Sequence, residues 1–288
     1  MLPSTGVRDS KSLPKPSHSI EKPPGLMSLI PSSLMKSSFD IRDQDNTKLK
    51  RLACAFVLIA RSSCIIMTGT KPGLQGYDEE QVHMMEENCI VVDKDDNIIG
   101  PDTKINCHLG EGKLHRAFSV LLFNLSGELL IQKRAADKIT FPSTWGNSCC
   151  SHPLHIDNEI EGVEGAKLAA KRKMEQELGI DQDLIDSNQL CFITKMHYRA
   201  RADEKWVEHE IDYIFALNCD VETRSNPNEI AELKYVTEDE LQELFDQGEK
   251  IGPWFRLIKE NFLNDIWKTL DDLSKAADGK LHTMDECQ

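Results

Sequence analysis

Two carboxylates occur at alternating positions in the segment KWVEHEIDY, where Glu208 and Glu210 flank His209. On a β-strand, successive side chains point to opposite faces, so the two carboxylates are expected to share one face while His209 points away. Two carboxylates on one face repel each other unless one is protonated or a cation lies between them. This spacing favours an acid–base pair or a metal site.

Further side chains that bind metal ions or exchange protons occur in three other segments. His108 precedes His115 by seven residues, the run SCCSHP contains Cys150 and His152, and a helical pattern ends near Glu177. Imidazole nitrogens combined with carboxylate oxygens form a mixed site suited to zinc, manganese or iron. A neighbouring thiol is then free to act as an acid or a base.

Each of these residues also has a plainer explanation. A single histidine is commonly a surface residue, paired carboxylates commonly form a solvated strand face, and adjacent cysteines are commonly small buried apolar side chains. The chemical interpretation therefore depends on the combination of segments.

The charge of the 288-residue chain is unevenly distributed. The formal net charge is −14, with a balance of +6 over residues 1–75 and −20 over the remainder. The acidic part of the chain after residue 75 lacks the basic face that nucleic-acid phosphates require, and we expect no nucleic-acid partner. An anionic substrate would need a few local cations or a metal ion to reverse the electrostatic field at its site.

The nine cysteines show no CxxC pair, which favours free thiols in a reducing compartment.

The elements that must hold these side chains alternate between strand and helix patterns. Strands are predicted by alternation and turn residues over 89–100 (two strands and a turn), 117–124, 128–134, 190–198 and 208–217. Helices are predicted over 161–179, over 237–248 with a capping box of Thr237 and Glu240, and over 253–273. Interleaved strands and helices favour an α/β sandwich over separate all-α and all-β units.

The chain divides into three parts by composition. Residues 1–75 carry many Ser, Pro and Lys without periodicity and are predicted to be a disordered leader. Within it, residues 48–67 hold apolar runs that Arg61 splits, too short to span a membrane, and they fit either an organelle-targeting segment or an unstructured leader. Residues 76–275 are the predicted folded domain, and 276–288 a flexible tail.

Several segments, in the right order, resemble one enzyme family. They are TKINCHL (103–109), LHRAFSVLLFN (114–124), ITFPSTWGNSCCSHPL (139–154), KWVEHEIDY (205–213) and PWF (253–255). Over roughly residues 77–275 the chain resembles type I isopentenyl-diphosphate delta-isomerases. The resemblance implies a Nudix-like α/β/α sandwich with a mixed sheet. It also implies interconversion of isopentenyl and dimethylallyl diphosphate through a tertiary carbocation, for isoprenoid and sterol biosynthesis.

The resemblance assigns roles to particular residues. It implies catalysis by Cys150 and Glu210, with support from Tyr198. It implies metal ligation by His108, His115, His152, Glu208 and Glu210, and a Mg²⁺ site at Glu177 and the Cys150 carbonyl. Substrate contacts are implied for Lys104, Arg134, Lys138, Ser151, Lys173 and Trp254, of which Trp254 faces the hydrocarbon.

The helix over 161–179 matches the Nudix box G-x5-E-x7-R-E-U-x-E-E-x-G-U (U is bulky and apolar) only in part. Asn158, Lys173 and Gln176 replace its first glycine and two of its glutamates. Losing these carboxylates favours binding over pyrophosphate hydrolysis. Elsewhere, Val207 replaces a glycine usual in the isomerases. A Nudix hydrolase and a non-catalytic binding protein on this scaffold are the alternatives.

The implied cofactors are Mg²⁺, carried with the substrate diphosphate, and one transition metal, Zn²⁺ or Mn²⁺. The implied partner is a small-molecule diphosphate; we expect no membrane span and a monomer. The C-terminal residues DECQ are not a peroxisomal tripeptide. We expect a cytoplasmic protein, with organelle targeting by the leader as the alternative. The residues alone leave open which of Cys150 and Glu210 is the acid in the forward direction.

Overall fold

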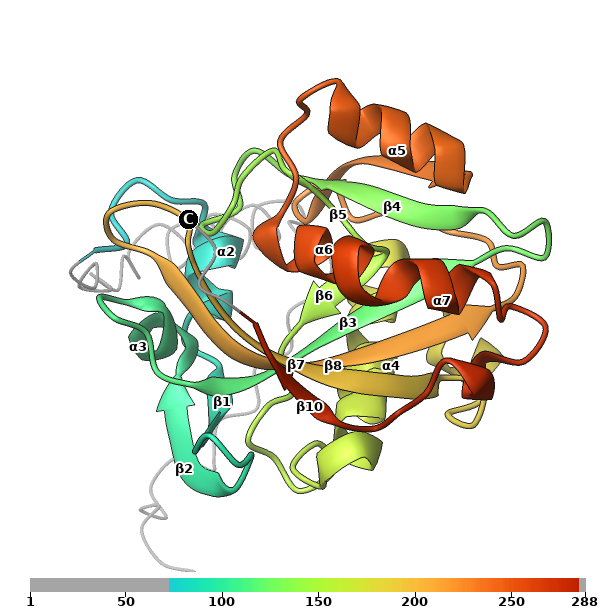
Figure 1. Cartoon of the computed structure of the whole chain (residues 1–288). Helices are drawn as coiled ribbons and strands as arrows, with labels where there is room; N and C mark the ends of the chain where they lie inside the picture. Colours follow the sequence, from blue (N-terminus) through green and yellow to red (C-terminus); the bar gives the residue numbers. More distant parts are fainter. Residues whose placement is uncertain (1–72, 285–288) are drawn as a thin grey trace, which may run out of the picture. The chain divides into compact units, whose positions relative to one another are not determined.

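A mixed β-sheet runs through residues 73–284, the part of the chain that the computed structural model describes (Figure 1). Its main path has the order β10-β7-β8-β3-β1-β2. These strands are β10 (Leu281–Thr283), β7 (Cys191–Arg201), β8 (Val207–Asn218), β3 (His115–Phe123), β1 (Asn88–Val92) and β2 (Ile98–Thr103). β3 pairs with β8 in parallel, and β7 pairs with β8 in antiparallel orientation.

The second edge of β3 is shared by several strands. At its far end Phe123 pairs with Leu129 of β4 (Leu129–Arg134). β4 in turn pairs in antiparallel orientation with β5 (Trp145–Gly146) and with β9 (Ile230–Val236). In its middle β3 pairs with β6 (Cys149–Ser151), and at its start with β1. This sharing brings residues from distant parts of the sequence to the strand that begins with His115.

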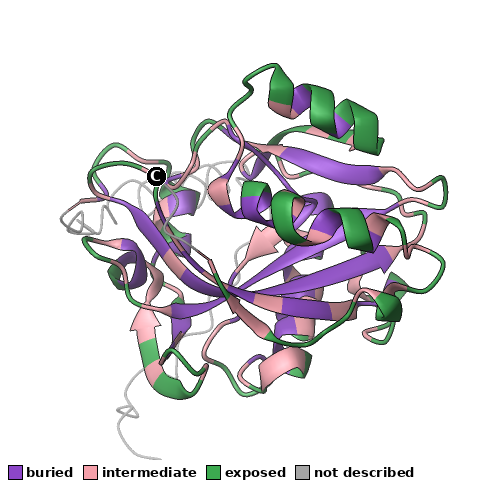
Figure 2. Cartoon of the chain, viewed as in Figure 1, coloured by how far each residue is buried: buried purple, intermediate pink, exposed green. Residues whose placement is uncertain are grey.

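Helices cover both faces of the sheet because β3 is apolar on both sides. Its alternate residues Phe118, Val120 and Leu122 pack in one buried cluster with α4 (Gly162–Leu178). The intervening Leu121 and Phe123 pack in a second cluster with α6 (Pro253–Ile258) and α7 (Asn264–Trp267). Figure 2 shows the strands between these helices as buried. The predicted α/β/α sandwich is therefore confirmed.

The remaining helices lie at the rim of the sheet. They are α2 (Glu79–Met84), α3 (Lys104–His108) and α5 (Glu238–Asp246), with 3-10 turns at Gln182–Leu184 and Leu273–Lys275. The capping box predicted at the start of the α5 helix is present, since the Thr237 side chain accepts from the Glu240 N–H and the Glu240 side chain binds the Thr237 N–H. The predicted strands and the helix over 161–179 are also present, whereas α2, α3, β5, β6, β9 and β10 were not predicted.

The helix predicted over 253–273 is shorter and interrupted. A π-helical turn, η2 (Lys259–Leu263), separates α6 from α7, and α7 ends at Trp267. The Thr269 hydroxyl donates to the carbonyls of Asp265 and Ile266, an arrangement in which a side chain competes with the continuing helix. The predicted helix is therefore confirmed over 253–267, with a π-helical turn inside it, and wrong for residues 268–273.

Part of the segment 276–288, which was predicted to be a flexible tail, forms a strand. Leu281–Thr283 forms β10, parallel to β7, with Leu281 opposite Lys195. The Thr194 hydroxyl donates to Asp278 and to the Lys280 carbonyl, so polar groups at the edge of β7 hold the chain in place. Residues 285–288 lie outside the described part.

The predicted leader, 1–75, lies outside the described residues as far as residue 72. Its last residues pack on the folded domain: Leu74 is buried with Met85, Ile105 and Trp206, and the Lys205 ammonium contacts the Gly73 carbonyl. The domain therefore begins no later than Gly73. Among residues 73–284 there is no helix with the length and apolar character needed to cross a membrane.

Candidate active site

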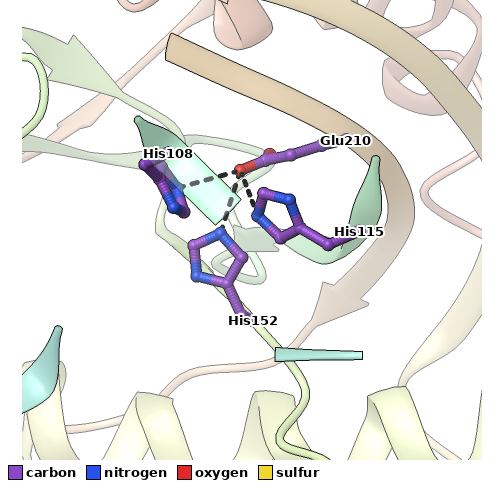
Figure 3. A group of neighbouring side chains, drawn as sticks. All are labelled: His108, His115, His152 and Glu210. Carbon is purple, nitrogen blue, oxygen red and sulfur yellow. Dashed lines mark hydrogen bonds and ion pairs between the residues drawn. The ribbon is translucent and has the colours of Figure 1, made fainter. Parts of the chain in front are cut away.

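Three imidazoles and one carboxylate converge where β3 begins (Figure 3). His108 is the last residue of α3, His115 is the first residue of β3, and His152 follows β6. Glu210 lies on β8 directly opposite His115 in the parallel register. All four side chains are buried, and their candidate ligand atoms lie within 4.8 Å of one another. The structure thus brings together four of the five residues implied as ligands of the transition metal.

The Nε2 atoms of the three rings surround one carboxylate oxygen. Glu210 Oε1 lies 2.9 Å from His152 Nε2, 3.5 Å from His115 Nε2 and 3.8 Å from His108 Nε2. Backbone carbonyls accept from the other nitrogen of two rings, Lys104 O from His108 Nδ1 at 2.8 Å and Lys113 O from His115 Nδ1 at 2.7 Å. Because a carbonyl only accepts, these two Nδ1 atoms carry a proton, and in the neutral ring the Nε2 atom of each then has a lone pair for a metal ion.

This donor set fits a metal ion. His115 Nε2 is buried without a hydrogen-bond partner, as is His152 Nδ1. Buried polar atoms without partners are costly, and neutral imidazoles whose second nitrogen is held by a carbonyl are typical metal ligands. The cluster of His108, His115, His152 and Glu210 is therefore suited to an ion that prefers mixed nitrogen and oxygen ligands.

Glu208, the fifth implied ligand, lies beside this cluster and shares a hydrogen-bond donor with Glu210. The Tyr198 hydroxyl lies 2.9 Å from Glu208 Oε2 and 2.7 Å from Glu210 Oε2. Burial and the charge of Glu210 raise the pKa of Glu208 to about 8. Burial opposes the charge of Glu210 as well, but the imidazoles of His115 and His152 hold its pKa well below the usual range. Neighbouring carboxyls whose pKa values are pushed apart are an acid–base arrangement.

Cys150 lines the same pocket as Glu210. It lies on β6 opposite Ser119, and like every described cysteine it is a free thiol. Burial raises the pKa of this thiol, which keeps it protonated at neutral pH. Cys149 differs: it is fully buried in the α4 cluster, with its Sγ 3.7 Å from Glu177 Oε2.

Cations and an aromatic ring complete the pocket. The other implied substrate contacts that line it are Lys104, Arg134, Lys138, Ser151 and Trp254. The Trp254 indole N–H donates to Asn147 Oδ1 at 2.9 Å, and the Arg134 guanidinium lies 5.6 Å from the centre of the indole ring. The pocket therefore has positive charge beside an oriented apolar ring, within a strongly acidic chain.

Lys173 is the one implied substrate contact that does not line this pocket. It is buried on α4, where its Nζ lies 3.2 Å from Glu177 Oε1. Glu177, the implied Mg²⁺ ligand, does line the pocket. One turn of helix separates the two residues, so their pairing follows from the i,i+4 geometry.

Two buried carboxyls of this region were missed. Asp212 follows Glu210 by two residues on the same face of β8, lines the pocket and accepts from the Ser119 hydroxyl at 2.8 Å. Burial and Glu210 raise its pKa well above the usual range. The alternation that identified Glu208 and Glu210 extends to it. Glu229 lies just before β9 and pairs with Lys138, and no spacing in the sequence indicates that contact.

The fold and this site define the class of protein. Residues 113–257 match the family model described as NUDIX domain, which spans half of the chain and includes α4 together with β3, β4, β8 and β9. The chain is a Nudix-domain protein.

Curated relatives narrow this class. The isopentenyl-diphosphate delta-isomerase of Gibberella zeae is 46% identical over 216 residues, covering 72% of this chain and 85% of the relative. The enzyme of that name in Mesocricetus auratus is 47% identical over 218 residues (72% and 96%). The one in Schizosaccharomyces pombe is 48% identical over 216 residues (72% and 94%). The chain belongs to the isopentenyl-diphosphate delta-isomerase family, as its sequence motifs predicted.

Proposed function

We propose that this chain interconverts isopentenyl diphosphate and dimethylallyl diphosphate, the activity for which its relatives are named. The observation that carries the proposal is the composition of one pocket. A half-buried thiol, Cys150, and a buried carboxylate, Glu210, line it together with three cationic side chains. Proton donors and acceptors beside a site for an anion are what this reaction requires.

The reaction moves one proton on and another off a carbon skeleton. Adding a proton to C4 of isopentenyl diphosphate produces a tertiary cation at C3, and removing a proton from C2 completes the shift of the double bond. Each step needs a positioned acid or base. Cys150 and Glu210 are the two groups proposed for these steps, and Tyr198 orients Glu210 through its hydrogen bond.

The cationic intermediate needs electron density and exclusion of water. The indole of Trp254 is 3% exposed and lines the pocket. A cation over such a ring is stabilised by roughly 0.5–2 kcal/mol. Water would trap the cation as an alcohol, so the burial of Trp254, Tyr198 and Glu210 serves the same end.

Two metal sites belong to the proposal. His108, His115, His152 and Glu210, joined by Glu208, would hold a transition metal, Zn²⁺ or Mn²⁺, that fixes Glu210 and tunes its acidity. Glu177 and the Cys150 carbonyl would hold a Mg²⁺ ion that arrives with the diphosphate. Lys104, Arg134, Lys138 and Ser151 would contact the diphosphate oxygens, with Lys173 balancing the charge of Glu177.

A direct assay tests the proposed function. The full-length chain is incubated with isopentenyl diphosphate and Mg²⁺, and the product is examined for the acid lability of an allylic diphosphate. We expect acid-labile product and no release of inorganic phosphate. Phosphate release from this substrate or from nucleoside diphosphate derivatives, without allylic product, would instead indicate a Nudix hydrolase.

Replacing Tyr198 by Phe removes the one hydroxyl that two carboxylates share. We expect kcat to fall roughly 10- to 100-fold, because Glu210 loses a charge-assisted hydrogen bond of about 1.5–3 kcal/mol, which is not compensated by solvent in a buried site. KM should change little, since Tyr198 lies at the carboxylate end of the pocket. A Tyr198→Phe variant with wild-type kcat would show that the hydroxyl does not orient Glu210.

Deleting residues 1–72 should leave kcat and KM within about threefold of the full-length values, because every proposed site residue lies at Lys104 or later. A folded but inactive 1–72 deletion would contradict this expectation.

Deleting residues 1–77 should lower the melting temperature. It removes Leu74, whose burial stabilises the fold by about 1.5–3 kcal/mol, and the Tyr77 hydroxyl that accepts from the Trp206 indole.

Cytoplasmic location and a monomeric state stay predictions.

A further inference from the structure

A buried carboxylate, Glu229, lies next to one of the cations that line the pocket. Its Oε2 accepts from Lys138 Nζ at 2.6 Å, and its Oε1 accepts from Gln81 Nε2 at 3.2 Å. The side chain is 2% exposed. Both carboxylate oxygens therefore already have donors from the protein, and neither is directed at solvent.

Glu229 lies behind the pocket wall. Lys138 and Gln81 are among the described residues that line the pocket, whereas Glu229 is not. A group in this place does not touch a ligand in the pocket. It acts on such a ligand only through the side chains in front of it.

The cations of the pocket need a counter-charge. Lys104, Arg134 and Lys138 are all partly buried and line one pocket, where their like charges repel one another. The pKa of Lys138 is lowered to about 8, chiefly by burial. The positive charges of Arg134 and Lys104 contribute to the lowering of this pKa, whereas the negative charge of Glu229 opposes it. Burial also opposes the charge of Glu229, yet Lys138 and Lys173 hold its pKa at about 2. Each member of the Lys138–Glu229 pair thus keeps the other charged.

The backbone around Glu229 connects two walls of the pocket. The Ala135 N–H, on the loop that carries Lys138, donates to the Glu229 carbonyl at 2.9 Å. The Gln81 amide of α2 donates to Asn228 Oδ1 at 2.6 Å as well as to Glu229. The position of Lys138 is therefore set from behind by a residue that is itself held at several points.

We propose that Glu229 is a positioning residue that holds Lys138 at the diphosphate-binding end of the pocket, and that it acts on the diphosphate through Lys138. This inference rests on the proposed function, because it takes the ligand of Lys138 to be a diphosphate. It adds a residue that no chemical motif of the sequence identifies.

Binding of magnesium pyrophosphate to the full-length chain tests the inference by calorimetry, without reference to turnover. Glu229→Gln should weaken binding by at least roughly 10-fold, because one partner of a buried ion pair is removed. Glu232→Gln, the same chemical change at an exposed position of β9, should bind as wild type does. In the isomerase assay Glu229→Gln should raise KM while kcat stays within about threefold.

A double-mutant cycle tests whether the effect passes through Lys138. Lys138→Met should weaken binding, and adding Glu229→Gln to it should cause no further loss. Should Glu229→Gln alone unfold, the double variant, which removes both charges, is compared with Lys138→Met. Additive losses, or a Glu229→Gln variant that loses kcat with unchanged KM, would overturn the inference.

The wild-type chain separates this inference from the proposed function. Absence of magnesium pyrophosphate binding by the wild type would overturn the role of Glu229. Binding that depends on Glu229 as described, in a chain that does not isomerise isopentenyl diphosphate, would overturn the proposed function alone.

Discussion

A Cys150→Ala variant should lose isomerisation by at least roughly 10³-fold while remaining folded. The thiol lines the pocket with Glu210, and burial keeps it protonated, so its removal deletes one of the two groups proposed to exchange protons with the substrate. A positioned acid or base contributes about 10²–10⁴-fold to a rate. The rate of formation of dimethylallyl diphosphate, measured beside a circular dichroism melt, gives the result.

The adjacent cysteine provides a matched control. Cys149 is fully buried against α4 and points away from the pocket, so Cys149→Ala should keep activity within about tenfold. Its expected cost is in stability, roughly 1–2 kcal/mol for the lost buried sulfur. If the two variants lose activity to the same extent, Cys150 is not the reacting thiol.

A Glu210→Gln variant should lose both turnover and bound transition metal. The Glu210 carboxylate faces three imidazole Nε2 atoms, and an amide in its place removes the negative charge and directs N–H groups at ring lone pairs. Turnover should fall by at least about 10³-fold, because the same residue is proposed as the second proton-exchanging group. Metal content of the purified chain, measured by elemental analysis, should fall to a small fraction of the wild-type value.

The control for this variant is Glu204→Gln, an exposed glutamate in the loop before β8. It should retain wild-type metal content and turnover. Fully active wild-type chain that contains no transition metal would contradict the proposed role of the cluster, as would a Glu210→Gln variant that keeps its metal.

Local periodicity was sufficient to predict one part of the site. Glu208 and Glu210 share a face, and His209 points to the other side, where its Nε2 lies 3.0 Å from His197 Nε2. Side chains on a strand alternate between its two faces whatever the surroundings, so this arrangement can be predicted from three consecutive residues. The capping box before the α5 helix was readable for the same reason, because its hydrogen bonds lie within four residues.

The convergence of the histidines was not readable from spacing. His115 meets Glu210 because β3 and β8 pair in parallel in one particular register, and His152 reaches both because β6 occupies the other edge of β3. Strand register depends on packing across the whole sheet. The residue types suggested a mixed nitrogen and oxygen site, and the family resemblance assigned these residues as its ligands, but their spacing alone does not predict that they meet.

Contacts over long separations explain the remaining omissions. Glu229 pairs with Lys138 across 91 residues, and β10 pairs with β7, whose edge is polar at Thr194. Neither contact has a signal in the local pattern. The π-helical turn inside the helix predicted over 253–273 was missed for a different reason, because apolar periodicity does not distinguish an α-helical turn from a π-helical one.

The proposed isomerisation exchanges protons at two carbons of the substrate. Isopentenyl diphosphate incubated with the chain and Mg²⁺ in D₂O tests it most directly, with the product examined by NMR. We expect dimethylallyl diphosphate with deuterium in the methyl group formed from C4, because a protein group in exchange with solvent delivers that hydrogen. Substrate recovered unchanged, or an allylic product without deuterium at that carbon, would contradict the account.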